Sequence, residues 1–184
     1  VAQIGGLQTT IFDPSIANLF FSDNAADAEV RGVEADLIWV PESVEGLTIS
    51  ASVSMLDTEI TKTLTTSQDV VAGDSLAFAP EFQGNLQARY EWQTASGMTA
   101  HIMPHLAHSA ESYSDIIRIN RDRIAGWTML GLTAGVTTDT WGAELFINNL
   151  TDERAELSRN YINDRERVSY AAPRTMGVRM TYNF

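Results

Sequence analysis

Alternation of apolar and polar residues constrains this chain more than any other feature, and it is clearest in the last nine residues, Met176–Phe184. One parity carries Met176, Val178, Met180, Tyr182 and Phe184, and the other carries Gly177, Arg179, Thr181 and Asn183. Successive side chains of a β-strand point to opposite faces, so this segment predicts a strand with one apolar and one polar face. The segment also ends on an aromatic ring with no polar tail. A strand whose apolar face meets lipid and whose last ring lies at the membrane interface explains both features.

Composition leaves two classes of fold open. The 184 residues are 44% hydrophobic, yet no apolar run reaches the roughly 20 residues that a transmembrane helix needs. A soluble domain or a β-barrel therefore remains. The absence of cysteine excludes a disulfide framework and a thiol site. The formal net charge of -12 argues against nucleic acid as a partner, because phosphate binding requires a basic patch.

Eight segments are expected to be β-strands, because they are rich in β-branched or aromatic residues and lie between clusters of Gly, Pro, Asp or Ser. They lie near Gln3–Phe12, Ala28–Val40, Leu47–Ile60, Pro80–Trp92, Met98–Ser109, Ile124–Thr137, Trp141–Asn149 and Pro173–Phe184. Gly5 and Gly6 interrupt the first segment. No segment of useful length has helical periodicity. The predicted fold class is therefore all-β.

Short and long connections alternate along the chain. The short ones are Pro41–Gly46, Gln93–Gly97 and Thr138–Thr140, and the long ones are Asp13–Asp27, Thr61–Ala79, Ala110–Arg123 and Leu150–Ala172. In an antiparallel sheet this pattern places every short turn at one end and every long loop at the other. Outer-membrane β-barrels have this asymmetry, with short periplasmic turns and long extracellular loops.

Aromatic residues distinguish a membrane barrel from a soluble one, whose alternation would be the same with the apolar face inward. Trp39, Tyr90, Trp92, Trp141, Tyr182 and Phe184 all fall at the end with the short turns. This position predicts a belt of rings at a water–lipid interface. Phe78, Phe82 and Trp127 are expected to form a thinner belt at the loop end.

Five stretches carry a resemblance to a known family: Arg31–Pro41, Gly46–Ile60, Ala79–Phe82, Glu144–Asp152 and Pro173–Phe184. Together they resemble the C-terminal barrel region of TonB-dependent receptors, the ligand-gated active transporters of the bacterial outer membrane. The resemblance implies a transmembrane antiparallel barrel of about 22 strands whose lumen is filled by a plug domain. Residues 1–184 are then expected to be about eight C-terminal strands, with the plug domain and the earlier strands absent.

The resemblance also implies a function, a location and partners. The full protein would import a scarce, bulky nutrient such as a ferric siderophore across the outer membrane of a Gram-negative bacterium, energised by TonB. This segment would supply barrel wall, extracellular loops and an assembly signal formed by the apolar residues of Met176–Phe184. An edge strand of this kind offers backbone pairing and side-chain contacts to the assembly machinery. Membrane lipid, lipopolysaccharide, the plug domain, TonB and a small-molecule ligand are the other expected partners.

Two long loops hold the candidate ligand contacts, which are Tyr113, Arg118 and Arg121 in one loop and Arg159, Tyr161 and Arg165 in the other. Arginine side chains bind the anionic groups of a chelate or sugar acid through forked hydrogen bonds. The alternative is that these mixed charges keep an exposed loop soluble or bind lipopolysaccharide.

His101, Met103 and His105 share one parity of one predicted strand, on the lumen side. Strand residues four apart are about 13 Å apart, too far to share an ion ligated at about 2 Å. These residues are therefore expected to contact the plug or to be solvated in the lumen. Pro104 cannot donate a ladder hydrogen bond, so a bulge or local irregularity is expected there.

Three other classes of protein are alternatives to this interpretation. A complete eight-stranded barrel acting as an anchor, pore or adhesin is geometrically feasible, although Glu34 and Asp36 make its narrow core strongly acidic. A soluble lipocalin-like binding module needs the apolar face inward. An enzyme is not expected, because no nucleophile motif, phosphate loop or spaced set of metal ligands is present. His105, His108, Ser109 and Asp115 are the only residues that offer triad chemistry, and no cofactor is implied.

Overall fold

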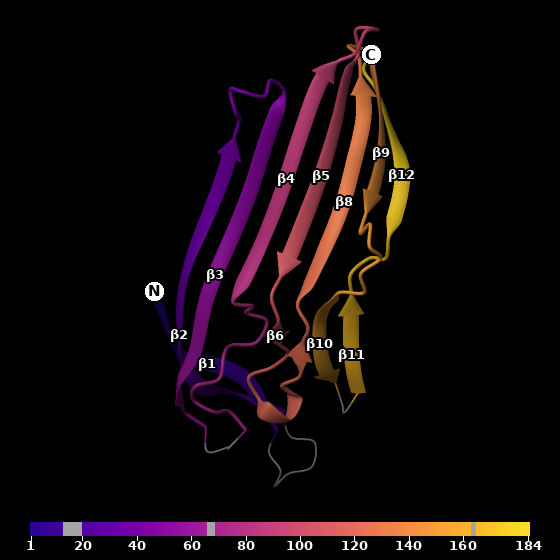
Figure 1. The fold of residues 1–184 in the computed structure, drawn as a ribbon. Helices are drawn as coiled ribbons and strands as arrows, with labels where there is room; N and C mark the ends of the chain where they lie inside the picture. Colours follow the sequence, from indigo (N-terminus) through magenta and orange to yellow (C-terminus); the bar gives the residue numbers. More distant parts are fainter. Residues whose placement is uncertain (13–19, 66–68, 163–164) are drawn as a thin grey trace.

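The computed structural model describes residues 1–12, 20–65, 69–162 and 165–184. Its main feature is an antiparallel sheet of eight strands in the order β1-β2-β3-β4-β5-β8-β9-β12 (Figure 1). These strands are β1 (Ala2–Phe12), β2 (Phe20–Trp39), β3 (Leu47–Thr63), β4 (Phe82–Gln93), β5 (Thr99–Ser109), β8 (Trp127–Thr137), β9 (Trp141–Asn148) and β12 (Thr175–Tyr182). Each corresponds to one predicted strand, so the all-β prediction is confirmed.

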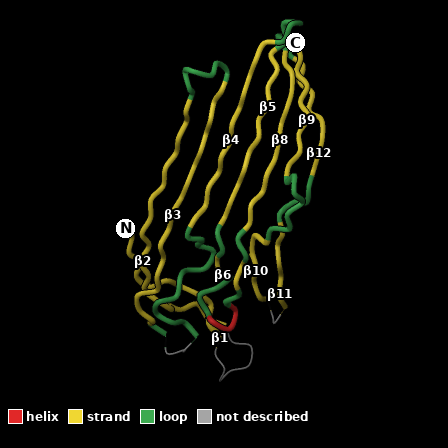
Figure 2. The backbone as a smooth tube through the Cα atoms, viewed as in Figure 1, coloured by secondary structure: helices red, strands yellow, loops and turns green. Residues whose placement is uncertain are grey.

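Two of the predicted long loops contain regular structure of their own. β6 (Ser112–Tyr113) pairs with β7 (Arg123–Ile124), and the 3-10 helix η1 (Arg118–Asn120) lies between them. β10 (Glu156–Ile162) and β11 (Arg165–Tyr170) form a hairpin within the last long connection (Figure 2). Within the described residues, the structure contains no helix that is both long enough and apolar enough to cross a membrane.

The sheet is open. In the described part of the chain β1 pairs with β2 and β12 pairs with β9, so these two strands form opposite edges. β2 begins at Phe20, earlier than the predicted start at Ala28, and β3 continues past Ile60 to Thr63. The predicted loop Asp13–Asp27 is therefore partly strand, and residues 13–19 lie outside the described residues.

The registers arrange side chains in continuous rows across the sheet. One row joins Leu47, Tyr90, Ile102, Ala134, Leu145 and Val178, and the next joins Glu91, His101, Gly135, Glu144 and Arg179. We name the faces that carry these rows the apolar face and the polar face. Leu145 is 63% exposed and Met180 is 79% exposed on the apolar face. The apolar side chains of the sheet therefore do not form a soluble-type core.

Buried apolar packing lies instead at the loop end of the sheet. Ala25 and Ala26 of β2 pack with Ile60 of β3, and Val70 and Ile116 from the connecting loops cover them. The extra length of β2 and β3 supplies the strand residues of this cluster. This cluster shows that the long connections fold onto the ends of the strands.

The aromatic residues of the predicted belt are exposed at the end with the short turns: Trp39, Tyr90, Trp92, Trp141, Tyr182 and Phe184. The rings of Tyr90 and Trp92 stack at 5.5 Å, and those of Tyr182 and Phe184 meet edge to face at 5.1 Å. The expected second belt is wrong for Trp127. Trp127 is opposite Ser109, which is opposite Gln83, so its side chain belongs to the polar face.

Pro104 interrupts one ladder without shifting it. Its pairing with Leu132 of β8 is in register. On the β4 side the registered pairs run from Gln87↔His105 to Tyr90↔Ile102 with constant offset, omitting the intervening positions. Of the two predicted outcomes, a bulge or a local irregularity, the structure has the irregularity, because the missing N–H opens the ladder without requiring an extra residue.

Candidate functional site

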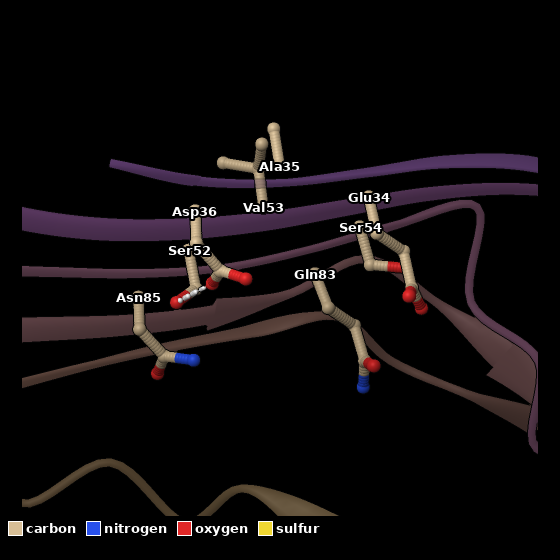
Figure 3. Close-up of a pocket in the computed structure, with 8 residues that line it drawn as sticks. All are labelled: Glu34, Ala35, Asp36, Ser52, Val53, Ser54, Gln83 and Asn85. Atoms are coloured by element: carbon tan, nitrogen blue, oxygen red, sulfur yellow. Dashed lines mark hydrogen bonds between the residues drawn. The ribbon is translucent and has the colours of Figure 1, made fainter.

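The polar face of β2–β4 forms an open groove of about 240 Å³. Figure 3 shows the groove side chains Glu34, Asp36, Ser52, Ser54, Gln83 and Asn85 on one side of the sheet, with Ala35 and Val53 on the other. Ser52 Oγ donates a hydrogen bond of 2.7 Å to Asp36 Oδ1. The alternation in the sequence therefore produces a polar, acidic wall.

A charged row continues the polar face toward β12. Glu144 Oε2 accepts a hydrogen bond of 3.0 Å from Arg179, and Glu144 Oε1 lies 3.2 Å from His101 Nε2. This second contact has the distance of an ion pair but not the geometry of a hydrogen bond, because neither ring nitrogen of His101 has a hydrogen-bond partner. Arg89 pairs with Glu91 at 2.7 Å on the same face.

His101 is buried, with a side chain that is 1% exposed. Its ring lies against Gly135, where an added Cβ would be 2.9 Å from Cε1. The expectation of a solvated lumen group is wrong for His101, because the glycine opposite leaves room for the ring to lie flat on the sheet. His105 is arranged in the same way over Gly131, where a Cβ would overlap the ring.

The predicted contacts of the first loop, Tyr113, Arg118 and Arg121, are occupied by other protein groups. The Arg121 guanidinium stacks over the Tyr113 ring at 3.9 Å and donates to the Ser75 carbonyl at 2.9 Å. Arg118 forms a fork with Asp74, with both contacts at 3.0 Å. These arginines therefore join residues 61–79 to residues 110–123.

The predicted contacts of the second loop, Arg159, Tyr161 and Arg165, lie on the β10–β11 hairpin. Arg159 contacts Glu156 at 2.7 Å and Glu166 at 2.5 Å. Its pKa is raised by the hydrogen bond to Glu156 and by nearby carboxylates. The Tyr161 hydroxyl donates to Asp122, and this bond raises the pKa of Tyr161. Arg165 is exposed and pairs with Ile162 across the hairpin.

A smaller cavity of about 170 Å³ at the loop end was missed from the sequence. Trp127, Phe78 and Leu157 contribute its apolar lining, and Gln83 and Ser112 contribute polar groups. Two features of the sequence could have placed Trp127 on the polar face. It has the same parity as Met129, and Leu130 and Leu132 have the other parity. No local pattern identifies Leu157, because the hairpin that presents it lies in a predicted loop.

The structure does not assemble the residues considered for catalysis. His108 lies on the apolar face, where Nδ1 is 2.7 Å from Thr128 Oγ1. Ser109 lies on the polar face and is opposite Trp127. Across the described ranges, no three His, Asp or Glu side chains are grouped closely enough to hold a metal ion.

Several solved structures are similar to this chain. The chain is similar to the ferric yersiniabactin uptake receptor FyuA from Yersinia pestis, with TM-score 0.74 and 18% identity, covering 89% of this chain and 25% of that one. It is also similar to BauA, the ferric preacinetobactin receptor from Acinetobacter baumannii, with TM-score 0.72 and 21% identity, covering 96% of this chain and 26% of that one. A third similar structure is the ferripyoverdine receptor of the outer membrane of Pseudomonas aeruginosa bound to ferripyoverdine, with TM-score 0.65 and 15% identity, covering 99% of this chain and 24% of that one.

At these identities the structures establish a shared fold, and the chain spans about a quarter of their length. No curated protein matches the chain in sequence. The family described as TonB dependent receptor-like, beta-barrel matches residues 3–150. That match covers the first seven strands of the main sheet, from the second residue of β1 to the end of β9. The chain therefore belongs to the TonB-dependent receptor β-barrel family.

Proposed function

We propose that this chain is the C-terminal wall of a TonB-energised outer-membrane receptor that imports a scarce, bulky nutrient such as a ferric siderophore. Residues 1–184 supply eight barrel strands, the extracellular loops and the assembly signal at Met176–Phe184. The plug domain and the earlier strands belong to the rest of the receptor. Family membership supports this proposal, as do the similar structures that are receptors for ferric chelates.

The observation that carries the proposal is the exposed apolar face. Val178, Met180 and Leu145 are each more than half exposed. In water this exposure costs about 25 cal/mol per Å² of apolar surface, and contact with lipid removes that cost. The aromatic belt then lies at the periplasmic interface of the outer membrane. The polar face lines the lumen, where the plug domain covers it.

Transport through such a wall requires binding groups and no catalytic group, because the ligand crosses without chemical change. The long loops and β10–β11 lie at the extracellular end in this orientation, where a ligand first meets the protein. Outer-membrane lipid, lipopolysaccharide, the assembly machinery, the plug domain and TonB are the partners of the proposed receptor.

A closed eight-stranded barrel is the alternative. Closure requires β1 to pair with β12, whereas these strands are opposite edges of the sheet in the described residues. The open sheet therefore favours the larger receptor. Reading the coding sequence before Val1 tests this choice, because the proposal expects a plug domain encoded there.

Uptake of ⁵⁵Fe under iron limitation tests the transport function. We expect deletion of the gene for the full-length receptor to abolish uptake of at least one ferric chelate from a panel. The full-length gene should restore that uptake in a strain with TonB and fail to restore it in a strain without TonB. Unchanged uptake of every chelate in the deletion strain contradicts the ferric-chelate function, and restored uptake without TonB contradicts the energy coupling.

A further inference from the structure

We propose that the loop-end cavity lined by Trp127, Phe78 and Leu157 is a subsite for one uncharged aromatic ring of the transported ligand. This inference rests on the proposed transport function and names the chemistry that the wall recognises. The cavity lies beyond the groove of Figure 3, on the loop side of Gln83. It includes none of the loop residues that the sequence pattern favoured.

Three separate features of the backbone bring the apolar side chains to the cavity. Trp127 is the first residue of β8, and its pairing with Ser109 places it on the polar face. Leu157 lies at the register shift between Glu156 and Ser158 in the β10–β11 hairpin. Irregularities of this kind redirect a side chain out of the regular alternation. Leu157 and Phe78 are each 47% exposed.

Phe78 adds a strained backbone. It has a φ of 52°, in the left-handed region that residues other than glycine rarely adopt. Its N–H donates a hydrogen bond of 2.8 Å to the Tyr113 carbonyl, which holds this conformation. Backbone strain of this kind is concentrated at active sites, ligand clamps and switch regions. Folding alone gains little from the arrangement, because the ring remains half exposed.

The size of the cavity limits its occupant. At about 170 Å³, it is close to the engineered cavity of about 150 Å³ in another protein that binds benzene. A single six-membered ring fits this space, and a whole ferric chelate does not. The cavity is therefore one subsite of a larger binding surface.

The charges of the residues that line the cavity determine whether its occupant is neutral or ionised. Among the described residues that line the cavity, Glu156 alone is charged, and both of its carboxylate oxygens accept hydrogen bonds from Arg159, at 2.7 and 2.9 Å. The remaining polar groups are neutral amide and hydroxyl groups, those of Gln83 and Ser112 among them. An anionic ring would lose its hydration without gaining a cation in exchange. A neutral ring keeps the apolar contacts without that cost.

Fluorine NMR of the full-length receptor in lipid nanodiscs, labelled with 5-fluorotryptophan, tests the subsite. Benzamide is the probe, and acetamide and benzoate are its matched controls. We expect benzamide to shift the Trp127 resonance saturably, with a dissociation constant on the order of 1 mM, as such small fragments reach. Acetamide should give no saturable shift, and benzoate should bind at least tenfold more weakly. Trp127→Phe assigns the resonance, and Trp92 on the apolar face reports partition into the bilayer.

Two leucines provide the matched variants. Leu157→Ala removes one wall and should weaken benzamide binding at least threefold, whereas Leu145→Ala on the apolar face should leave it unchanged. An absent or unsaturable Trp127 shift, or equal binding of benzoate, overturns the subsite. A receptor that imports a ferric chelate while Trp127 does not respond retains the proposed function and loses the subsite. A responsive Trp127 in a receptor that imports no ferric chelate overturns the assignment of the ring to a transported ligand.

Discussion

Replacing Leu145 by arginine tests the orientation of the sheet in the membrane. Leu145 lies four residues from Trp141 of the aromatic belt, a distance of about 13 Å along the strand. A strand tilt of about 40° converts this distance into about 10 Å of depth, close to the middle of an apolar band about 25 Å tall. Arginine at that depth costs about 2–4 kcal/mol. The same change at an exposed position in water costs less than about 0.5 kcal/mol.

Urea unfolding of the full-length receptor in lipid vesicles measures this difference in the free energy of unfolding. Ala95→Arg is the matched control, because Ala95 is exposed in the short turn between β4 and β5, outside the apolar face and the polar face. We expect Leu145→Arg to lower the free energy of unfolding by about 2–4 kcal/mol and Ala95→Arg to leave it within about 0.5 kcal/mol. Equal effects of the two substitutions refute the assignment of the apolar face to lipid.

Three further predictions concern single contacts in the full-length receptor. Gly131→Ala should lower the free energy of unfolding by about 1–3 kcal/mol, because the new methyl group overlaps the His105 ring. Urea unfolding should show that adding His105→Ala restores part of this stability, and no restoration contradicts the proposed overlap. The raised pKa of Tyr161 favours its neutral form in the fold, so the hairpin should lose stability as pH rises above the ordinary tyrosine pKa of about 10; ultraviolet titration of Asp122→Asn should show the pKa returning toward that value. Deletion of Phe184 should lower the amount of receptor in isolated outer membranes, and unchanged amounts would remove the assembly-signal proposal.

The faces of the sheet were predictable because the side chain at each strand position points to one of only two faces. Leu145 and Glu144 are adjacent in sequence and fall on opposite faces, as the alternation predicts. The β10–β11 hairpin was not predictable, because its charged residues obscure any alternation. Arg159 contacts both Glu156 and Glu166, and this cross-strand pairing becomes evident only in three dimensions.

The site was less predictable than the fold. A loop arginine predicts an anionic ligand only when no nearby carboxylate binds it first. Asp74 is remote in sequence from Arg118, yet the folded loops bring the two together in a forked contact. Sequence also does not reveal the backbone of Phe78, whose positive φ depends on a hydrogen bond to another loop. The roles proposed for the loop residues and for Met176–Phe184 stay predictions.

The packed cluster of Ala25, Ala26, Ile60, Val70 and Ile116 would mark, in the proposed receptor, the boundary between the part of the sheet in lipid and the part in water. In the proposed receptor, the strands below the cluster rely on lipid to cover their apolar side chains, whereas the five residues of the cluster bury one another and stay packed in water. Mutational tolerance should follow the same division. Tips beyond the cluster accept insertions and new sequences, while the positions within it must conserve volume. In the proposed receptor, new ligand preferences would therefore arise around a fixed cluster of small and branched residues at the strand ends.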